Sequence, residues 1–389
     1  MSGWTSAPLG EICEINVGRT PSRNRRDYWG EGAPWLSIAD MNQGRNLIST
    51  KEQITQLAVA EATGRPAEPG TVLLSFKLSI GKVGIAGVPL FTNEAIAALP
   101  IRQPDRILPE FLYWALRALD LTSNSSRAAM GETLNKAKLR LVQVPLPPLN
   151  DQRRIVEVMD RADELRAKRR EALAHLDELA QSIFLDMFGD PATNGRGWVT
   201  STVGAVAEQV TDGEHQTPKR SDSGIKLLSA RNVRDGCLEF GNVDYIQVDE
   251  FERIRKRCEP RRGDILISCS GTIGRVAAVD TDEPFALVRS VALVRPVKEL
   301  LLSRFLEAYL QTPAMKARML RSAKASSQAN LFQGPIRALP VFLPPLELQQ
   351  EFQARTSAIA EIKAAHHAGL TELDGLFESL QDRAFRGLL

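Results

Sequence analysis

Apolar residues recur at alternating three- and four-residue spacing along two long stretches of the chain, residues 149–187 and 346–389, with one layer missing at Arg169 and His366. This spacing gathers apolar side chains on one face of a helix and is typical of helices that pair as a coiled coil. A helix of ~38 residues is about 57 Å long, so each predicted helix is also a spacer. The predicted stripes are Ile155, Val158, Ala162, Leu165, Ala172, Leu176, Leu179 and Ile183 in the first helix, and Phe352, Ile359, Ile362, Leu373, Leu376 and Leu380 in the second.

The alternative is that both helices lie on the surface of one large globular core. The length of the helices and their charged flanks, such as Arg153, Glu164 and Arg170, argue against this alternative. Two apolar stripes in one chain are natural partners for each other. We therefore predict that the two helices pack together.

A double proline precedes each predicted helix, in Leu146-Pro147-Pro148-Leu149 and in Leu343-Pro344-Pro345-Leu346. Proline donates no backbone hydrogen bond and disfavours helix in the residue before it, so each segment is a stiff, extended lead into its helix. At an offset of 197 residues the two modules align without a gap. The alignment also matches Leu173 with Leu370, Leu176 with Leu373, Asp177 with Asp374, Leu179 with Leu376, Ser182 with Ser379 and Phe188 with Phe385. The chain therefore contains a duplicated module.

The segments outside these helices consist of short apolar runs separated by glycines, which predicts a compact α+β unit in each half. In the first half we expect strands at residues 35–38, 70–76, 80–84 and 95–101 and a helix at 109–119. The second half repeats them at 263–268 and 273–276, with a helix at 302–310. The offset between the halves varies from 192 to 197, so the loops differ in length while the helical modules do not. This contrast is expected if the loops of each half recognise a different target while the helices keep a common role.

Composition describes an ordinary globular protein, with 389 residues, 43% hydrophobic residues and a net charge of +2. The length predicts two or three domains. No run of eighteen apolar residues occurs, so we expect neither a membrane span nor export. The four cysteines form no CxxC pair, which favours reduced thiols in a cytoplasm and predicts no metal site. Basic clusters at residues 19–26, 253–262 and 316–324 suit docking onto phosphates, although a charge run is usually a solvated face.

The chain lacks the motifs of the enzymes that act on DNA. Neither double proline has the Asn/Asp-Pro-Pro-aromatic form that holds a target amino group in a methyltransferase, and no phosphate-binding loop is present. Glu361-Ile362-Lys363 has the shape of a nuclease fragment, but it lies in a predicted helix without a preceding Pro-Asp strand. His215 has no nucleophile or carboxylate constellation around it. We therefore predict no catalytic residue and no metal ligand in this chain.

Several segments together resemble the specificity subunits of type I restriction-modification systems. Residues 212–218, which read DGEHQTP, and residues 224–233, which read GIKLLSARNV, look like the opening of a target recognition domain in that family. Residues 270–275, which read SGTIGR, and the Leu-Pro-Pro-Leu segment with Gln349 are similar to the same family. The first half departs from the pattern, with Gly18-Arg19-Thr20-Pro21 in place of the second half's motif. The resemblance covers essentially the whole chain.

The resemblance implies an α+β fold with two target recognition domains, residues 1–143 and 191–340, joined by helical spacers at 144–190 and 341–389 that form an antiparallel coiled coil. Each recognition domain would read one half of a bipartite double-stranded DNA site, and the helices would set the gap. Expected partners are two methyltransferase (M) subunits and restriction (R) subunits in the cytoplasm of a bacterium or archaeon. No cofactor is expected on this chain, whereas S-adenosylmethionine, ATP and Mg are expected on the partners.

Base reading requires donors and acceptors that reach base edges, while phosphate contacts only position the protein. Amides such as those of Gln216 and Asn232 suit adenine, and guanidinium groups such as those of Arg23 and Arg231 suit guanine. The predicted DNA-binding residues are Arg19, Thr20, Arg23, Arg25 and Lys82 in the first domain, and His215, Gln216, Thr217, Arg231, Asn232, Thr272 and Arg275 in the second.

Two other interpretations fit parts of the sequence. The chain could be a coiled-coil adaptor whose globular domains bind proteins, in which case its interactions would lack the steep salt dependence of phosphate contacts. It could also be a portion of a fused restriction-methylation enzyme. A neighbouring gene that encodes a complete methyltransferase would argue against the fused enzyme.

Overall fold

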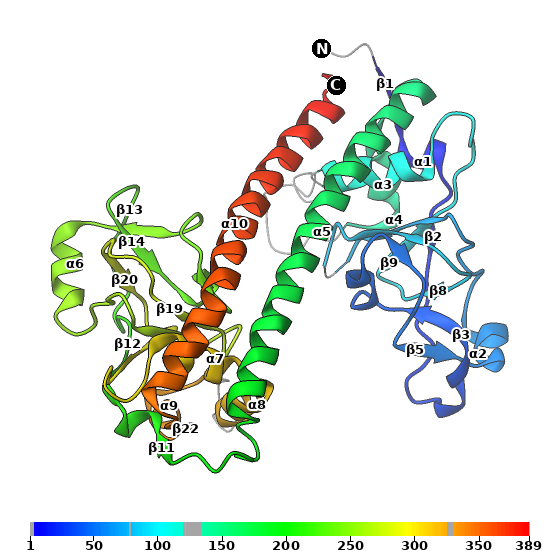
Figure 1. The fold of residues 1–389 in the computed structure, drawn as a ribbon. Coiled ribbons are helices and arrows are strands. Elements are labelled where there is room, and N and C mark those ends of the chain that lie inside the picture. Colours follow the sequence, from blue (N-terminus) through cyan, green and yellow to red (C-terminus); the bar gives the residue numbers. More distant parts are fainter. Residues whose placement is uncertain (1–3, 78, 120, 122–133, 325–329, 389) are drawn as a thin grey trace. The chain divides into compact units, whose positions relative to one another are not determined.

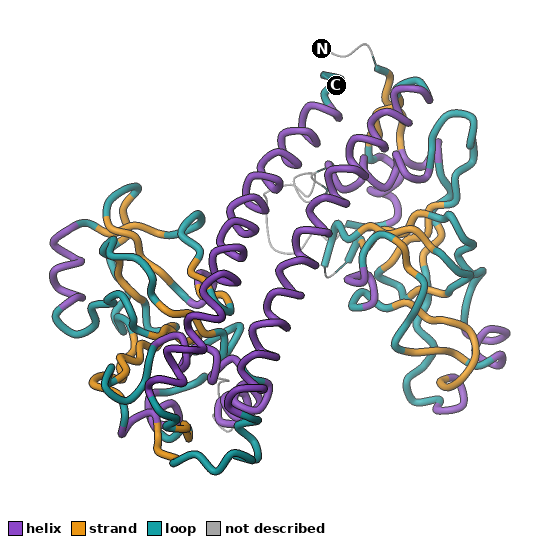
Figure 2. The backbone as a smooth tube through the Cα atoms, in the orientation of Figure 1, coloured by secondary structure: helices purple, strands orange, loops and turns teal. Residues whose placement is uncertain are grey.

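The computed structural model describes residues 4–77, 79–119, 121, 134–324 and 330–388. The chain forms two compact units, Met1–Arg170 with Gly369–Leu389, and Glu171–Ala368. Each unit combines one globular domain with segments of two long helices. Figure 2 shows that strands and loops make up most of each globular domain, whereas the long helices are uninterrupted.

The two long helices are α5 (Leu149–Phe188) and α10 (Leu346–Phe385), each of 40 residues, which confirms the prediction of two long helices. The first unit holds the beginning of α5 and the end of α10, and the second unit holds the remainder of both. Within the first unit, Arg166 bonds Asp374 while the guanidinium of Arg169 lies close to Gly369. The two helices therefore run antiparallel there (Figure 1).

An ion pair between the long helices occurs at equivalent positions in each unit, and Arg170 also pairs with Asp374 in the first unit. In the first unit Arg166 Nε of α5 lies 2.6 Å from Asp374 Oδ1 of α10. In the second unit Lys363 of α10 forms a salt bridge with Asp177 of α5. An offset of 197 residues relates the two pairs, with the helices exchanged. The duplication seen in the sequence is thus also a duplication of contacts.

The buried faces of these helices differ from the predicted stripes. Leu165 and Leu179 of α5 are 41% and 50% exposed, and Ile362 and Leu376 of α10 are 46% and 52% exposed. The buried positions that the stripes missed include Met159, Leu173, Phe184 and Phe188 of α5, and Phe377 and Ala384 of α10. Most of these side chains join the core of a globular domain. Each helix therefore buries side chains in the cores of the globular domains as well as against the other helix.

The first globular domain contains a five-stranded sheet in the order β2-β9-β6-β7-β4, a three-stranded sheet β5-β3-β8 and a pair β1-β10. Its elements are β1 (Thr5–Pro8), α1 (Leu9–Ile12), β2 (Asn16–Val17), η1 (Arg26–Tyr28), β3 (Trp29–Leu36), η2 (Asp40–Gln43), β4 (Asn46–Leu47), β5 (Glu52–Ile54), α2 (Gln56–Ala62), β6 (Val72–Ser75), β7 (Val83–Ala86), β8 (Phe91–Thr92), β9 (Ile96–Leu99), α3 (Pro109–Ala118), α4 (Lys136–Leu141) and β10 (Gln143–Leu146).

The second globular domain contains two four-stranded sheets, β12-β21-β18-β19 and β13-β17-β14-β20, and the pairs β11-β22 and β15-β16. Its elements are β11 (Thr200–Thr202), η3 (Val203–Ala205), β12 (Ala207–Asp212), β13 (Arg220–Ser221), β14 (Ile225–Leu228), η4 (Ala230–Asn232), β15 (Val233–Arg234), β16 (Cys237–Leu238), β17 (Asp244–Ile246), α6 (Val248–Arg255), β18 (Ile265–Ser268), β19 (Val276–Ala278), β20 (Phe285–Leu287), β21 (Val291–Pro296), α7 (Ser303–Gln311), α8 (Pro313–Lys324), α9 (Gln333–Arg337) and β22 (Pro340–Phe342).

The predicted strands and helices of both domains are present, with shifted ends. The strand predicted at residues 80–84 begins only at Val83, and the one predicted at 273–276 begins only at Val276. Gly81 and Gly274 adopt positive φ angles of 93° and 86°, which turn the chain before each strand. The helices predicted at 109–119 and 302–310 are α3 and α7.

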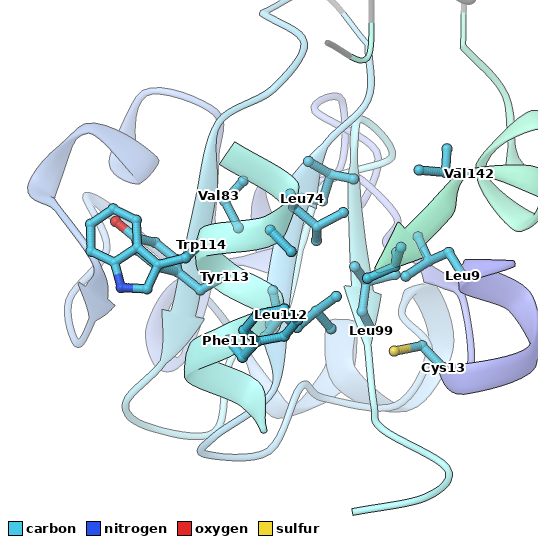
Figure 3. Close-up of a cluster of buried hydrophobic side chains, with 14 of the residues drawn as sticks. Leu9, Cys13, Leu74, Val83, Leu99, Phe111, Leu112, Tyr113, Trp114 and Val142 are labelled. Carbon is cyan, nitrogen blue, oxygen red and sulfur yellow. The ribbon is translucent and has the colours of Figure 1, made fainter. Parts of the chain in front are cut away.

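The core of each domain lies between the sheet and a short helix. In the first domain, side chains of α3 lie with those of β6, β7 and β9, including Leu74, Val83 and Leu99 (Figure 3). Phe111 and Leu112 of α3 are fully buried there. In the second domain α7 packs against β18 and β19 in the same way.

A buried glutamine at the start of each long helix ties that helix to its domain. Gln152 and Gln349 have no exposed surface, and each bonds three backbone groups, one as acceptor and two as donor. The partners of Gln152 are Leu108 N–H (2.9 Å), Arg106 C=O (2.8 Å) and Pro147 C=O (2.9 Å); those of Gln349 are Leu302 N–H (2.9 Å), Leu300 C=O (3.0 Å) and Pro344 C=O (2.9 Å). The glutamine after each double proline therefore holds the stretch before α3 or α7 against the start of the long helix.

Candidate nucleic-acid interface

All twelve predicted DNA-binding residues lie on or immediately beside three loops that each domain repeats. We name them loop A, after β2 or β12 (residues 18–25 and 213–219); loop B, after β3 or β14 (37–43 and 229–232); and loop C, after β6 or β18 (76–82 and 269–275). In the second domain the candidates occupy all three loops, and in the first domain they occupy loops A and C.

The three loops of the second domain meet on residues 287–290. Loop A bonds this segment through Glu214, whose N–H donates to Leu287 C=O at 2.8 Å. Loop B bonds it through Ala230, whose N–H donates to Ser290 Oγ at 3.0 Å. Loop C bonds it through Cys269, whose N–H donates to Ser290 C=O at 2.8 Å. Candidate residues separated by some sixty positions in sequence are thereby gathered on one support.

The first domain repeats this arrangement on residues 92–95. The N–H of Arg19 in loop A donates to Thr92 C=O at 2.8 Å. The N–H of Phe76 in loop C donates to Ala95 C=O at 2.9 Å, and Asn93 N–H donates to Leu36, the residue before loop B, at 3.2 Å. The two domains therefore present the same three-loop support.

A buried serine shapes loop C in both domains. Ser75 and Ser268 have no exposed surface, and each hydroxyl donates to the carbonyl four residues on, Ser79 or Thr272. The same hydroxyl oxygen accepts from the backbone N–H seven residues on, that of Lys82 or Arg275, at 2.9 Å in both cases. The equivalent cations Lys82 and Arg275 are thus held at matching positions.

Loop A begins in both domains at a glycine that lies in close contact with the backbone of the supporting segment. A Cβ atom on Gly18 would lie 2.1 Å from Thr92 C=O, and one on Gly213 would lie 2.4 Å from Leu287 C=O. No side chain fits at either position without moving the support. These glycines explain why loop A starts at the same place although its later residues differ in the two domains.

In loop A of the first domain, two arginines lie on aromatic rings. The Arg23 guanidinium lies 3.7 Å from the ring centroid of Trp29 and bonds Glu52 at 2.5 and 2.9 Å. These bonds raise the pKa of Arg23 and lower that of Glu52. Arg25 is held by Asp27 at 2.6 Å and lies 4.2 Å from the ring of Tyr28.

The remaining candidates of the first domain are differently placed. Arg19 is exposed, and its carbonyl accepts from the indole of Trp35 at 3.1 Å. The Thr20 hydroxyl donates to Glu94, which lowers the pKa of that carboxyl. Lys82 Nζ donates to Asn42 of η2 at 2.7 Å, so loops B and C are joined at this point.

In loop A of the second domain, His215 belongs to a polar cluster that includes a carboxylate, which the sequence analysis did not expect. Its Nε2 atom lies 2.8 Å from Asp212 Oδ2 and 3.0 Å from Arg257 Nη2, and Arg257 also bonds Asp212 at 2.5 Å. Gln216 and Thr217 are exposed beside this cluster. The side-chain amide of Gln216 is therefore presented to solvent while its neighbour is held in place.

Loops B and C of the second domain present further polar groups. The Arg231 side chain is 51% exposed, and its guanidinium lies 3.3 Å from Asp244, which also pairs with Arg220 at 3.2 Å. Thr272 is exposed at the tip of loop C, and Arg275 is half-buried at its end. Each of these side chains retains solvent-facing surface.

Asn232 is placed differently from the other candidates, because it is only 2% exposed. Its Oδ1 atom accepts from Ser229 N–H at 3.0 Å, and its Nδ2 atom donates to the carbonyls of Glu239 and Asn242 at 3.2 and 2.8 Å. Asp40 bonds Ser37 N–H at 2.8 Å in the equivalent turn of the first domain. Both ends of the Asn232 amide hold the turn, so the predicted contact with adenine would require breaking it.

The structure adds two arginines that the sequence analysis did not single out. Arg257 had been part of a basic cluster, and only the fold brings it to Asp212 and His215. Arg289 is exposed on the supporting segment, where its N–H donates to Glu214 C=O at 3.0 Å. In sequence it is one charge in an apolar run, so no local pattern marks it.

Among the described residues, no three His, Cys, Asp or Glu side chains gather as a metal-binding set. No helix in the described ranges is long and apolar enough to cross a membrane. All four cysteines are described and unpaired, and Cys13, Cys258 and Cys269 are buried.

A duplicated α+β domain with three supported polar loops, followed each time by a long helix, defines a protein with two related recognition surfaces. The type I restriction modification DNA specificity domain, as a sequence profile, matches residues 1–175 and 196–370. The chain therefore belongs to this family.

Relatives with assigned functions agree with the family. The chain is 30% identical over 192 residues to the type I restriction enzyme MjaIX specificity subunit of Methanocaldococcus jannaschii, an alignment that covers 48% of this chain and less than half, 44%, of that relative. It is 22% identical over 417 residues to the EcoBI specificity subunit of Escherichia coli, covering 99% of this chain and 86% of the relative.

A solved structure supports the fold. The S subunit of a type I restriction-modification system from M. genitalium aligns with a TM-score of 0.53 and 15% identity, and the alignment covers 98% of this chain and 96% of that one. At this identity the likeness concerns the fold alone. The order of domain and long helix, repeated once, is therefore a known architecture.

Proposed function

We propose that this chain is the DNA-specificity subunit of a type I restriction-modification complex, and that its two domains read the two halves of a bipartite site. The observation that carries the proposal is the repeated three-loop support. It holds a cation at equivalent positions, Lys82 and Arg275, while loop A carries Arg19 and Thr20 in one domain and His215 and Gln216 in the other. Shared positions suit phosphate contacts and differing positions suit sequence reading. Arg257 and Arg289 join the candidate DNA-binding residues.

The proposal includes the partners. Two methyltransferase subunits would dock on the chain and supply S-adenosylmethionine, and restriction subunits would supply ATP- and Mg-dependent cleavage. The chain itself would position these enzymes and perform no chemistry. Apolar residues exposed along the long helices, such as Leu165, Leu179, Ile362 and Leu376, are available for such docking.

The experiment that tests the proposal is methylome sequencing in a host free of DNA methylation. One strain would express this chain with the methyltransferase encoded beside it, and a second would lack this chain. A two-part motif that appears only with this chain supports the specificity role and gives both half-sites and the gap. A stable complex that adds no methylation would contradict it.

The adaptor alternative is weaker, because the family and the relatives with assigned functions are DNA-specificity proteins. The two interpretations differ in salt dependence. Phosphate contacts release counterions, so DNA affinity should fall steeply as salt rises. Affinity for a protein partner that is unaffected by salt, with no DNA binding at low salt, would favour the adaptor.

Gln216→Ala is expected to weaken recognition of the half-site that the second domain reads and to leave recognition of the other half-site unchanged. An exposed amide in loop A is suited to bidentate contact with adenine, and such a contact contributes roughly 1–3 kcal/mol of discrimination. The measurement is methylation rate on a panel of sites with single-base changes. Gln247→Ala is the matched control, because Gln247 is exposed in the same domain outside the three loops. Equal loss on every sequence would mean that Gln216 positions the DNA without reading it.

A further inference from the structure

The second unit contains a pocket of about 300 Å³ between its globular domain and the long helices. Its walls come from the turn at β16, from α7, and from segments of α5 and α10, all within Glu171–Ala368. Phe352 and Ile359 of α10 supply apolar wall, and Ala180 of α5 and Ala308 of α7 supply small side chains. Neither the candidate loops nor the buried glutamines Gln152 and Gln349 take part in it.

The first unit fills the equivalent place with two aromatic side chains. Leu108 and Leu302 bond equivalent glutamines, so α3 and α7 align at an offset of 194 residues, which matches Trp114 with Ala308. The offset of 197 in the long helices matches Phe377 with Ala180. Trp114 and Phe377 are 1% and 6% exposed, with ring centroids 5.7 Å apart. The pocket is therefore where the second unit lacks an indole and a phenyl ring.

A shift of one position along the short helix explains the missing indole. The first unit has Trp114 followed by Ala115, whereas the second has Ala308 followed by Tyr309. One residue is a rotation of about 100° around a helix, so the aromatic ring moves to another face. Tyr309 is fully buried against Phe342, at 5.2 Å between centroids. The ring thus joins the domain core and leaves the side facing α5 and α10 open.

Most charged side chains that line the pocket are paired, and Asp280 is exposed to solvent. Lys363 forms a salt bridge with Asp177, and Arg304 Nη1 lies 2.8 Å from Glu307 Oε2. The Cys237 Sγ atom lies 3.6 Å from His367 Nε2 in the wall. Burial raises the pKa of the Cys237 thiol to about 11 and lowers the pKa of His367, so both are uncharged at neutral pH. Such walls favour an uncharged ligand.

We propose that this pocket binds an uncharged planar aromatic group of about the size of indole, which takes the place that Trp114 and Phe377 fill in the first unit. Apolar cavities bind aromatic molecules, and a pocket of this volume lies at the lower end of small-ligand sites. The proposal rests on the comparison of the two units and does not depend on DNA recognition.

Cys237 provides a direct reporter of occupancy. It is the half-buried cysteine of the four, while Cys13, Cys258 and Cys269 are 1%, 2% and 4% exposed. The experiment is alkylation of the full-length chain, followed by mass spectrometry, with and without indole as the probe. Indole is expected to slow alkylation of Cys237 in a saturable manner. Alkylation of Cys237 that does not change at any indole concentration would overturn the proposal.

Filling the pocket with a larger side chain of the protein itself gives a second test. Ala308→Trp restores the side chain of the first unit and is expected to protect Cys237 without indole, to remove the effect of indole and to raise the unfolding temperature. Ala180→Phe is an independent filling variant from α5. Ala358→Trp is the matched control, because Ala358 is an exposed alanine of α10 outside the pocket, and it should respond to indole like the wild type. Filled variants that still respond to indole would contradict the assigned location.

Comparing the isolated chain with the assembled complex shows whether the aromatic ring comes from a small molecule or from a partner protein. A small aromatic molecule would protect Cys237 in the freshly isolated chain, and dialysis would remove this protection. An aromatic side chain of a partner would protect Cys237 only in the assembled complex, and Ala308→Trp would weaken that assembly. Either result supports the proposal and names the source. The absence of any response to indole would refute the proposal, whichever state shows protection.

Discussion

Replacing Gln152 with alanine is expected to lower the free energy of unfolding of the first unit by about 3 kcal/mol or more. The substitution leaves the N–H of Leu108 and the carbonyls of Arg106 and Pro147 without their partner. A buried polar group deprived of its hydrogen bond costs about 1–3 kcal/mol, and a small cavity adds to this. The same reasoning predicts that Gln349→Ala destabilises the second unit by a similar amount.

Hydrogen exchange followed by mass spectrometry can assign the loss to a unit. Gln152→Ala should accelerate exchange in the first unit and leave most of the second unchanged, and Gln349→Ala should do the reverse. Gln353→Ala is the control, because Gln353 lies one turn beyond Gln349 in α10 and is exposed. If Gln349→Ala exchanged no faster than this control, the buried glutamine would be shown not to hold the helix to its domain.

Lengthening both long helices is expected to widen the gap in the recognised DNA site while leaving the half-sites unchanged. The insertions belong where the two units divide, between Arg170 and Glu171 in α5 and between Ala368 and Gly369 in α10. Four residues add about 6 Å to a helix. Because neighbouring base pairs are about 3.4 Å apart, the gap should grow by about two base pairs. Methylation of the original site should be lost.

Methylome sequencing of the inserted variant measures both half-sites and the gap together. The ion pairs Arg166–Asp374 and Lys363–Asp177 lie on opposite sides of the insertion points, so each unit keeps its own pair. Alanine at Arg170 and Glu171 without insertion controls for the change in sequence. An altered half-site with the original gap would argue that the helices do not set the spacing.

Much of the candidate interface follows from sequence because it rests on a repeat and on loop chemistry. Arg231, Gln216 and Thr272 were predicted from polar residues between short apolar runs, and each retains exposed surface. Asn232 carried the same signal and is buried, because a side-chain amide that caps a turn cannot be told from one that faces solvent without its partners. Its contacts with Glu239 and Asn242 are made only in the folded domain.

Arg257 and Arg289 are the opposite case, because the sequence analysis did not single them out and the structure places them beside loop A. Arg257 reaches Asp212 across 45 residues, and Arg289 lies beside loop A because the segment at 287–290 supports all three loops. The fold of the domain makes these approaches, and contacts between residues distant in sequence leave no local pattern. The sequence therefore predicts polar loops between short apolar runs, whereas the contacts of individual side chains depend on the fold.

The sequence by itself determined the two long helices, their proline leads and the duplication, because helical periodicity and the restrictions of proline act over a few residues. Only the tertiary structure decided which faces are buried. Leu165 and Leu376 fit the helical stripe and are exposed, whereas Met159 and Phe377 are buried against the first domain. A helix that packs against a domain and a second helix has two candidate faces, and its own periodicity cannot rank them. The pocket beside Ala308 likewise depends on the turn at β16 and on α5, α7 and α10, which meet only in the fold.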